Sequence, residues 1–205
     1  TDINDTGEVV GGAQTTGGTW APFLWLPSAA YGFSAGMNSL GTLGGDVQRV
    51  DQRAEAINSL GEIVGRSFTS SGDGRAFIWL PASAHTLGAG LNDLGVLAGG
   101  DSSWAFDINE RGVVVGTSNR AGGGVRAFIW EDGVLSDLND LIDPSSGWTL
   151  LRATGINDDG EIVGWGLDAA GNGSAFVLVQ TCSGFSTAVQ TTASVLASGA
   201  AETNA

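Results

Sequence analysis

Two aspartates at equivalent points of a repeated sequence are the first candidates for chemistry in this chain. Asp46 and Asp101 each follow a Gly-Gly pair. Two carboxylates at one surface could bind a cation or a sugar hydroxyl group. Asp is also a common turn residue, so two solvated turn positions are the competing interpretation. We treat the pair as a candidate ligand-binding site.

Two tryptophans are the second group of candidates, because they break the pattern of the repeats. Trp104 lies four residues before a recurring isoleucine, where two other repeats have Arg53 and Arg152. Trp165 stands where the other repeats have Gly12, Arg66 and Thr117. A non-repeated aromatic ring can stack on a sugar or anchor a partner protein. Packing between neighbouring repeats is the alternative for both residues.

Residues for catalysis or metal binding are few. His85 is the only histidine, and no Gly-x-Ser-x-Gly elbow is present. One histidine cannot build a histidine-rich zinc site, and we expect His85 in a surface loop. Asp2-x-Asn4 resembles the start of a calcium loop but lacks its acidic fifth and distal positions, so a hairpin turn explains it better. We predict no catalytic residue, metal site or cofactor.

A phrase that occurs four times indicates the architecture that positions these residues. Ile-Asn-x-x-Gly begins at isoleucines 3, 57, 108 and 156, with spacings of 54, 51 and 48 residues. Each copy runs into Glu-Val-Val-Gly, Glu-Ile-Val-Gly or Val-Val-Val-Gly. A period near 50 residues is typical of repeat folds. Asn and Gly favour tight turns, so the phrase predicts a hairpin in every unit.

Four short strands are predicted in each unit, in the order Leu-x-x-Leu, Ile-Asn, Glu-Ile-Val-Gly and Ala-Phe-Ile-Trp. The strands are apolar on both faces, whereas a sheet with one wet face would alternate. Each sheet should therefore pack between two others. The fold class we predict is all-β, a β-propeller of about four four-stranded blades that is either whole or a fragment of a larger propeller. A β-solenoid is the runner-up.

Composition narrows the classes of partner. The chain has 205 residues, with 22 acidic and 8 basic residues and a formal net charge of −14. Nucleic-acid binding needs a basic surface, so we expect no nucleic-acid partner. An anionic membrane would repel a chain of this negative charge. The chain contains no run of 18 apolar residues, so the sequence predicts no membrane span. Cys182 is the only cysteine, so it forms no intramolecular disulfide, and we expect it to be inert.

Domain boundaries follow from where the repeats stop. Residues 1–180 form the predicted repeat domain, and residues 181–205 form a tail rich in Ser, Thr and Ala. The chain begins inside a repeat, so we expect that the native N-terminus, with any signal peptide, is missing. The first unit should then lack its Leu-x-x-Leu strand. One hypothesis is that the tail supplies this strand and closes the ring.

The combination of Ile-Asn-x-x-Gly-x-Ile-Val-Gly, Ala-Phe-Ile-Trp and Leu-Gly-Thr-Leu-Gly-Gly resembles the HAF family of extracellular repeats, over about 180 of the 205 residues. The family's His-Ala-Phe histidine is replaced by Arg75, Arg126 or Ser174, and the first unit reads Ala21-Pro22-Phe23. The resemblance implies bacterial export or display at the cell surface. It implies no particular reaction, because the family is defined by its repeat.

The function we expect is a non-catalytic extracellular module for binding or scaffolding, with an extracellular polysaccharide or a surface protein as partner. Its candidate ligand-binding residues are Asp46, Asp101, Trp104 and Trp165. The alternative is a glycan-processing propeller enzyme of the hydrolase or lyase type. Such an enzyme would need a convergent carboxylate or His–Tyr constellation, and the chain has one His85 and one Tyr31.

Overall fold

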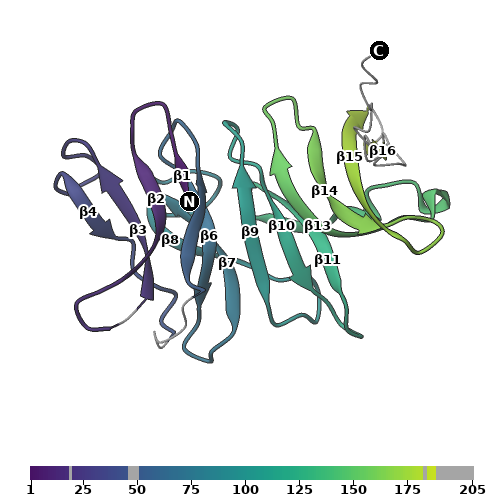
Figure 1. Cartoon of the computed structure of the whole chain (residues 1–205), viewed down its shortest axis with the longest axis horizontal. Helices are drawn as coiled ribbons and strands as arrows, with labels where there is room; N and C mark the ends of the chain where they lie inside the picture. Colours follow the sequence, from purple (N-terminus) through teal and green to yellow (C-terminus); the bar gives the residue numbers. More distant parts are fainter. Residues whose placement is uncertain (19, 46–50, 182–183, 188–205) are drawn as a thin grey trace, which may run out of the picture.

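The computed structural model describes residues 1–18, 20–45, 51–181 and 184–187, and these form four antiparallel sheets (Figure 1). The first sheet contains β1 (Asp2–Ile3), β2 (Val9–Gln14), β3 (Trp20–Leu26) and β4 (Gly36–Ser39). The second contains β5 (Arg53–Ile57), β6 (Ile63–Phe68), β7 (Gly74–Leu80) and β8 (Gly90–Gly95). The third contains β9 (Ser103–Ile108), β10 (Val114–Asn119), β11 (Val125–Glu131) and β12 (Val134–Asp137). The fourth contains β13 (Thr149–Ile156), β14 (Ile162–Leu167), β15 (Gly173–Thr181) and β16 (Gly184–Thr187).

Every sheet is a meander, in which each strand pairs with the strand before it in the chain. Two short 3-10 helices, η1 (Leu138–Asp140) and η2 (Pro144–Ser146), lie between the third and fourth sheets in the chain. The prediction of an all-β chain with four four-stranded sheets is confirmed. No helix among the described residues is long and apolar enough to cross a membrane.

The four sheets stand side by side in chain order, with the first and fourth at opposite ends of the row (Figure 1). First strands contact one another from sheet to sheet, as β1 does β5, β5 does β9 and β9 does β13. Three apolar clusters fill the spaces between neighbouring sheets. The second and third sheets are thus buried on both faces, which explains why their strands do not alternate between apolar and polar residues.

The predicted order of strands within a unit was wrong. The Leu-x-x-Leu element does not open a sheet but comes at the end of one. In the first sheet the last strand, β4, ends at Ser39, directly before Leu40. In the second sheet Leu94 lies in the last strand, β8. The first sheet therefore has all four strands, and the hypothesis that the tail fills a gap there loses its premise. The strand β16 pairs with β15 and extends the fourth sheet beyond residue 180, whereas residues 188–205 lie outside the described part.

The hairpin predicted from Ile-Asn-x-x-Gly is confirmed. In the second sheet, the backbone N–H of Asn58 donates to the carbonyl of Glu62 (3.1 Å), and the N–H of Gly61 donates to the carbonyl of Asn58 (3.2 Å). The Asn58 side-chain oxygen also accepts from the N–H of Glu62 (3.0 Å). Gly61 has a φ of 77°, a conformation that glycine adopts without strain.

Candidate functional site

The first strand of each of the last three sheets carries a β-bulge that turns one residue out of the ladder. The strand pairing skips Glu55, Phe106 and Thr154, each two residues before the recurring isoleucine, and in β13 it also skips Leu151. Opposite each bulge is the glycine that ends Glu-Ile-Val-Gly or its variant. A Cβ on that glycine would overlap a backbone carbonyl oxygen of the bulged strand, so the glycine permits the bulge. Bulges commonly re-aim side chains, and these build a site.

The bulges in the second and third sheets bring Trp104 against two arginines. The Arg53 and Arg66 guanidinium carbons each lie 4.9 Å from the centre of the Trp104 ring. The indole N–H of Trp104 donates to Glu55 Oε1 (2.9 Å), and Arg53 Nε donates to the same oxygen (2.7 Å). One carboxylate therefore holds the ring and one of its arginines in a fixed orientation.

The aromatic surface continues along β9 toward the fourth sheet. Phe106 stacks on Trp104 with 5.3 Å between ring centres and an interplanar angle of 28°. The Arg152 guanidinium carbon from β13 lies 4.5 Å from the centre of the Phe106 ring. We call this continuous set the arginine–aromatic platform. It consists of Arg53, Glu55, Trp104, Phe106 and Arg152.

The arginine–aromatic platform is partly exposed to solvent and carries positive charge. The side chain of Arg53 is 39% exposed, Arg152 is exposed, and both platform rings are half-buried. Among the described residues, no carboxylate lies within ion-pair distance of Arg152. The platform is therefore a local excess of positive charge, with guanidinium groups lying over both rings, on a chain of net charge −14.

Trp165, at the fourth sheet, lies next to the platform. It is 47% exposed and pairs in register with Arg152. A pocket of about 370 Å³ is lined by Val125, Leu151, Arg152 and Trp165. The two tryptophans chosen from the sequence are thus joined through Phe106 and Arg152, although Trp104 and Trp165 belong to different sheets.

The structure describes only one member of the aspartate pair. Asp46 lies outside the described residues. Asp101 binds the side chain of Asn119, whose amide donates to its carboxylate and whose oxygen accepts from its backbone N–H (2.9 Å). This is a loop-stabilising arrangement of the kind expected of a turn aspartate.

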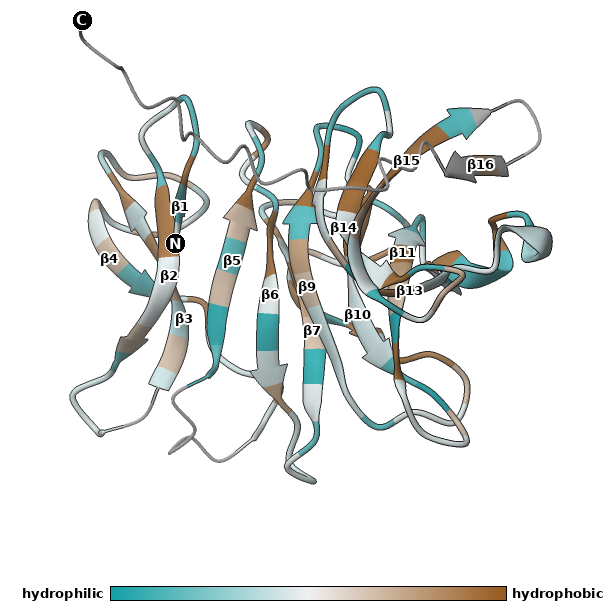
Figure 2. Cartoon of the chain, turned by 45° about the vertical axis from the view of Figure 1, so that its right-hand side comes forward, coloured by the Kyte–Doolittle hydropathy of each residue, from teal (hydrophilic) through white to brown (hydrophobic). Residues whose placement is uncertain are grey.

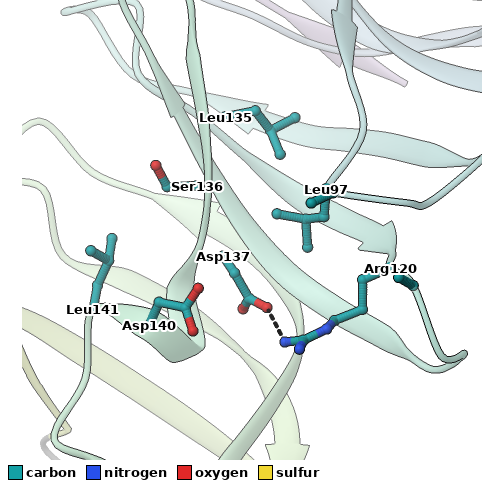
Figure 3. A pocket seen from close by; sticks show the side chains of 9 residues that line it. Leu97, Arg120, Leu135, Ser136, Asp137, Asp140 and Leu141 are labelled. Atoms are coloured by element: carbon teal, nitrogen blue, oxygen red, sulfur yellow. Dashed lines mark hydrogen bonds and ion pairs between the residues drawn. The ribbon is translucent and has the colours of Figure 1, made fainter.

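A larger pocket of about 550 Å³ lies where the third sheet meets the loops before, within and after it (Figure 3). In Figure 3 the Arg120 guanidinium points at Asp137, with Nη1 and Oδ2 3.3 Å apart. The other Asp137 oxygen accepts from the backbone N–H of Asn139 (2.9 Å) and caps η1. Arg120 and Asp137 therefore satisfy one another within this pocket, which contains none of the candidate residues chosen from the sequence.

His85 contacts two carboxylates, those of Glu62 and Asp132, at the end of the sheets where the Asn-turns lie. Its Nε2 lies 2.8 Å from Glu62 Oε1, and its Nδ1 lies 3.3 Å from Asp132 Oδ1. Burial lowers the pKa of His85, but the hydrogen bonds and charges of Glu62 and Asp132 outweigh it and raise the pKa above the ordinary 6.5. His85 lies in the loop between β7 and β8 as expected, but its side chain is only 16% exposed, so it is more covered than a surface loop residue would be.

The first sheet contains the same arrangement with a different ring. Tyr31 occupies the matching loop position, with a φ of 54° against 51° for His85. Its hydroxyl group lies 3.4 Å from Glu8 Oε2, and burial together with that carboxylate raises the pKa of Tyr31. Two units thus use a ring to cover the turn glutamate, which indicates a structural role for His85.

Sequence reasoning missed Arg53, Glu55, Phe106 and Arg152. Their signal was present, because the positions two and four residues before the isoleucine change type from repeat to repeat while the isoleucine stays. Only Trp104 stood out, since the bulge that brings these positions to one surface has no local sequence signature apart from the glycine opposite.

Among the described residues, no group of three or more His, Cys, Asp or Glu side chains is arranged to hold a metal ion. Comparison with family models finds no match for the chain. A search of the curated proteins likewise finds no match.

Proposed function

We propose that this chain is a non-catalytic binding module of the β-propeller type, and that it binds an extracellular polysaccharide on the arginine–aromatic platform. Support for the propeller comes from the four successive four-stranded meanders and from the contacts of their first strands. Radially stacked blades bring their first strands together in this way. The HAF resemblance adds the expectation of a secreted or surface-displayed bacterial protein.

The observation that carries the proposal is the fixed geometry of Trp104 and Phe106. Carbohydrate binding uses flat rings that are held rigid before the ligand arrives, so that little entropy is lost on binding. Here Glu55 orients the indole through a 2.9 Å hydrogen bond, and the phenyl ring stacks beside it. Arg152 adds a guanidinium that can donate to sugar hydroxyl or carboxylate groups.

A binding measurement on polysaccharides tests the proposal. The 205-residue chain is presented to a glycan array and to immobilised neutral and uronic-acid polysaccharides. Arg152→Ala and Phe106→Ala should each weaken the binding at least tenfold. Arg111→Ala is the matched control for the charge change, because Arg111 is exposed in an Asn-turn rather than on the platform, and it should bind like the unsubstituted chain.

Three outcomes would reject the proposal. Equal loss from Arg111→Ala would indicate a general charge effect. Binding to a surface protein but to no polysaccharide would favour the scaffold alternative. Hydrolysis or eliminative cleavage of any polysaccharide would favour the glycan-processing enzyme, for which the residues around His85 would then be the first to substitute.

A further inference from the structure

The faces between neighbouring sheets follow one pattern, and the two end faces of the row present the same pattern uncovered. Val10, Val64 and Val115 occupy one repeat position, face the following sheet, and are each 0% exposed. Val163 occupies this position in the fourth sheet and is 45% exposed. Figure 2 shows apolar segments on β14 and β15 at this end of the row.

The opposite end of the row shows the complementary difference. Ile57 and Ile108 face the preceding sheet and are 7% and 6% exposed, whereas Ile3 at the same repeat position is 63% exposed. Trp79 is 6% exposed, and Trp25 at its repeat position is 39% exposed. Each end of the described row therefore presents an interior type of surface.

Hydrogen bonds between the turn asparagines join neighbouring sheets, and this series of bonds stops at both ends of the row. Between neighbouring sheets, the side-chain amide of one turn asparagine donates to the backbone carbonyl of the next. The bonds run from Asn4 to Asn58 (3.2 Å), from Asn58 to Asn109 (3.1 Å) and from Asn109 to Asn157 (3.1 Å). In the described residues, Asn157 has no such acceptor beyond it, and the Asn4 carbonyl has no such donor before it.

A second series of hydrogen bonds between the turns also stops at the ends of the row. The backbone N–H of Ser59 donates to the Glu110 carboxylate (2.9 Å), and the N–H of Glu110 donates to the Asp158 carboxylate (2.9 Å). Asp158 is the last residue of this series, with a free N–H among the described residues. Asp5 occupies the same repeat position in the first sheet and carries the carboxylate that such an N–H requires.

We infer that the open face of the fourth sheet docks the open face of the first sheet of a second copy of this chain, head to tail. The three interior interfaces are examples of this contact within one chain. In the docked pair, Val163 of one copy is buried beside Ile3 of the next, and Asn157 donates to the Asn4 carbonyl. A contact between two different faces either closes into a ring or extends as a row.

Complementary variants test the contact. Val163→Asp places a charge on the fourth-sheet face, and Ile3→Asp places one on the first-sheet face. By sedimentation velocity, the unsubstituted chain should associate as its concentration rises, and each variant alone should stay monomeric. A mixture of the two variants should form a one-to-one dimer and nothing larger, because each retains the face that the other has lost.

Controls separate docking from misfolding and from general stickiness. Leu60→Asp substitutes a 56% exposed apolar residue in a turn of the second sheet and should leave association unchanged. Circular dichroism should show the same β signal in all variants. A monomeric unsubstituted chain at millimolar concentration, or a mixture that stays monomeric, would overturn the inference. Association that begins only after deletion of residues 188–205 would also overturn it, by assigning the face to that segment.

Discussion

The second and fourth sheets contain the same phrase in the same hairpin, but only the second has neighbours on both faces. Asn58 is 4% exposed, whereas Asn157 is exposed, and Val64 is 0% exposed against 45% for Val163. The local hydrogen bonds of the two turns are nearly identical, with 2.7 Å and 2.8 Å from the asparagine amide to the turn glutamate. The repeated residues thus serve two purposes, making the turn and joining it to the next sheet.

The largest loss of stability is expected from a glycine substitution that should affect the second and fourth sheets equally. It therefore serves as the reference for the predictions that should differ between the two sheets. Gly65→Ala and Gly164→Ala each force a Cβ onto the carbonyl oxygen opposite, from Arg53 or Arg152 in the same sheet. We expect a loss of about 3 kcal/mol in the free energy of unfolding for both, because backbone cannot move aside as a side chain can. Chemical denaturation measures it. A small loss for Gly164→Ala alone would indicate a fourth sheet already loosened in solution.

The turn asparagines should separate the two sheets most strongly. Asn58→Ala leaves the buried Glu62 carboxylate and the Asn109 carbonyl without the amide that now donates to both. We expect it to cost about 2–3 kcal/mol, the range for orphaned buried polar groups. Asn157→Ala removes the turn bonds alone at an exposed site and should cost about 1 kcal/mol. Equal losses by denaturation would show that the bond between sheets contributes nothing.

The valines test the apolar part of the same interface. Val64→Ala removes two methyl groups from a closed cluster, and we expect it to cost about 2 kcal/mol. Val163→Ala should cost about 0.5 kcal/mol at dilute concentration, because its side chain is 45% exposed. If the chain docks head to tail, the loss from Val163→Ala should grow with protein concentration, whereas the loss from Val64→Ala should not.

Much of the fold could be predicted from the sequence, because the same pattern of turn residues and apolar runs occurs in four units. The period, the Asn-Gly turn chemistry and the apolar runs indicate four packed sheets. The order of strands was wrong, because the sequence shows which strands are adjacent but not where one sheet stops. Leu94 belongs to the last strand of the second sheet, although its phrase reads equally well as the start of the next unit.

The candidate site was predictable only in part. Trp104 and Trp165 could be picked as exceptions to the repeat, but their connection through Phe106 and Arg152 depends on bulges and on contacts between sheets. Asp101 looked equivalent in sequence, yet its carboxylate is used by Asn119. A turn aspartate and a ligand-binding aspartate share one sequence signature, and only the neighbours in space distinguish them.

The smallest expected effect concerns the rings that cover the turn glutamates of the first and second sheets. The pKa of His85 is raised in the folded state, so its stabilising contribution is present below the unfolded value near 6.5 and is lost as pH rises through the folded value. His85→Tyr copies Tyr31 of the first sheet, whose pKa is raised from 10.0 and which does not titrate in this range. Thermal unfolding between pH 6 and 8 should show stability falling with pH in the unsubstituted chain and a flatter profile in His85→Tyr. Superimposable profiles would show that the Glu62 and Asp132 contacts of His85 are too weak to couple its titration to folding.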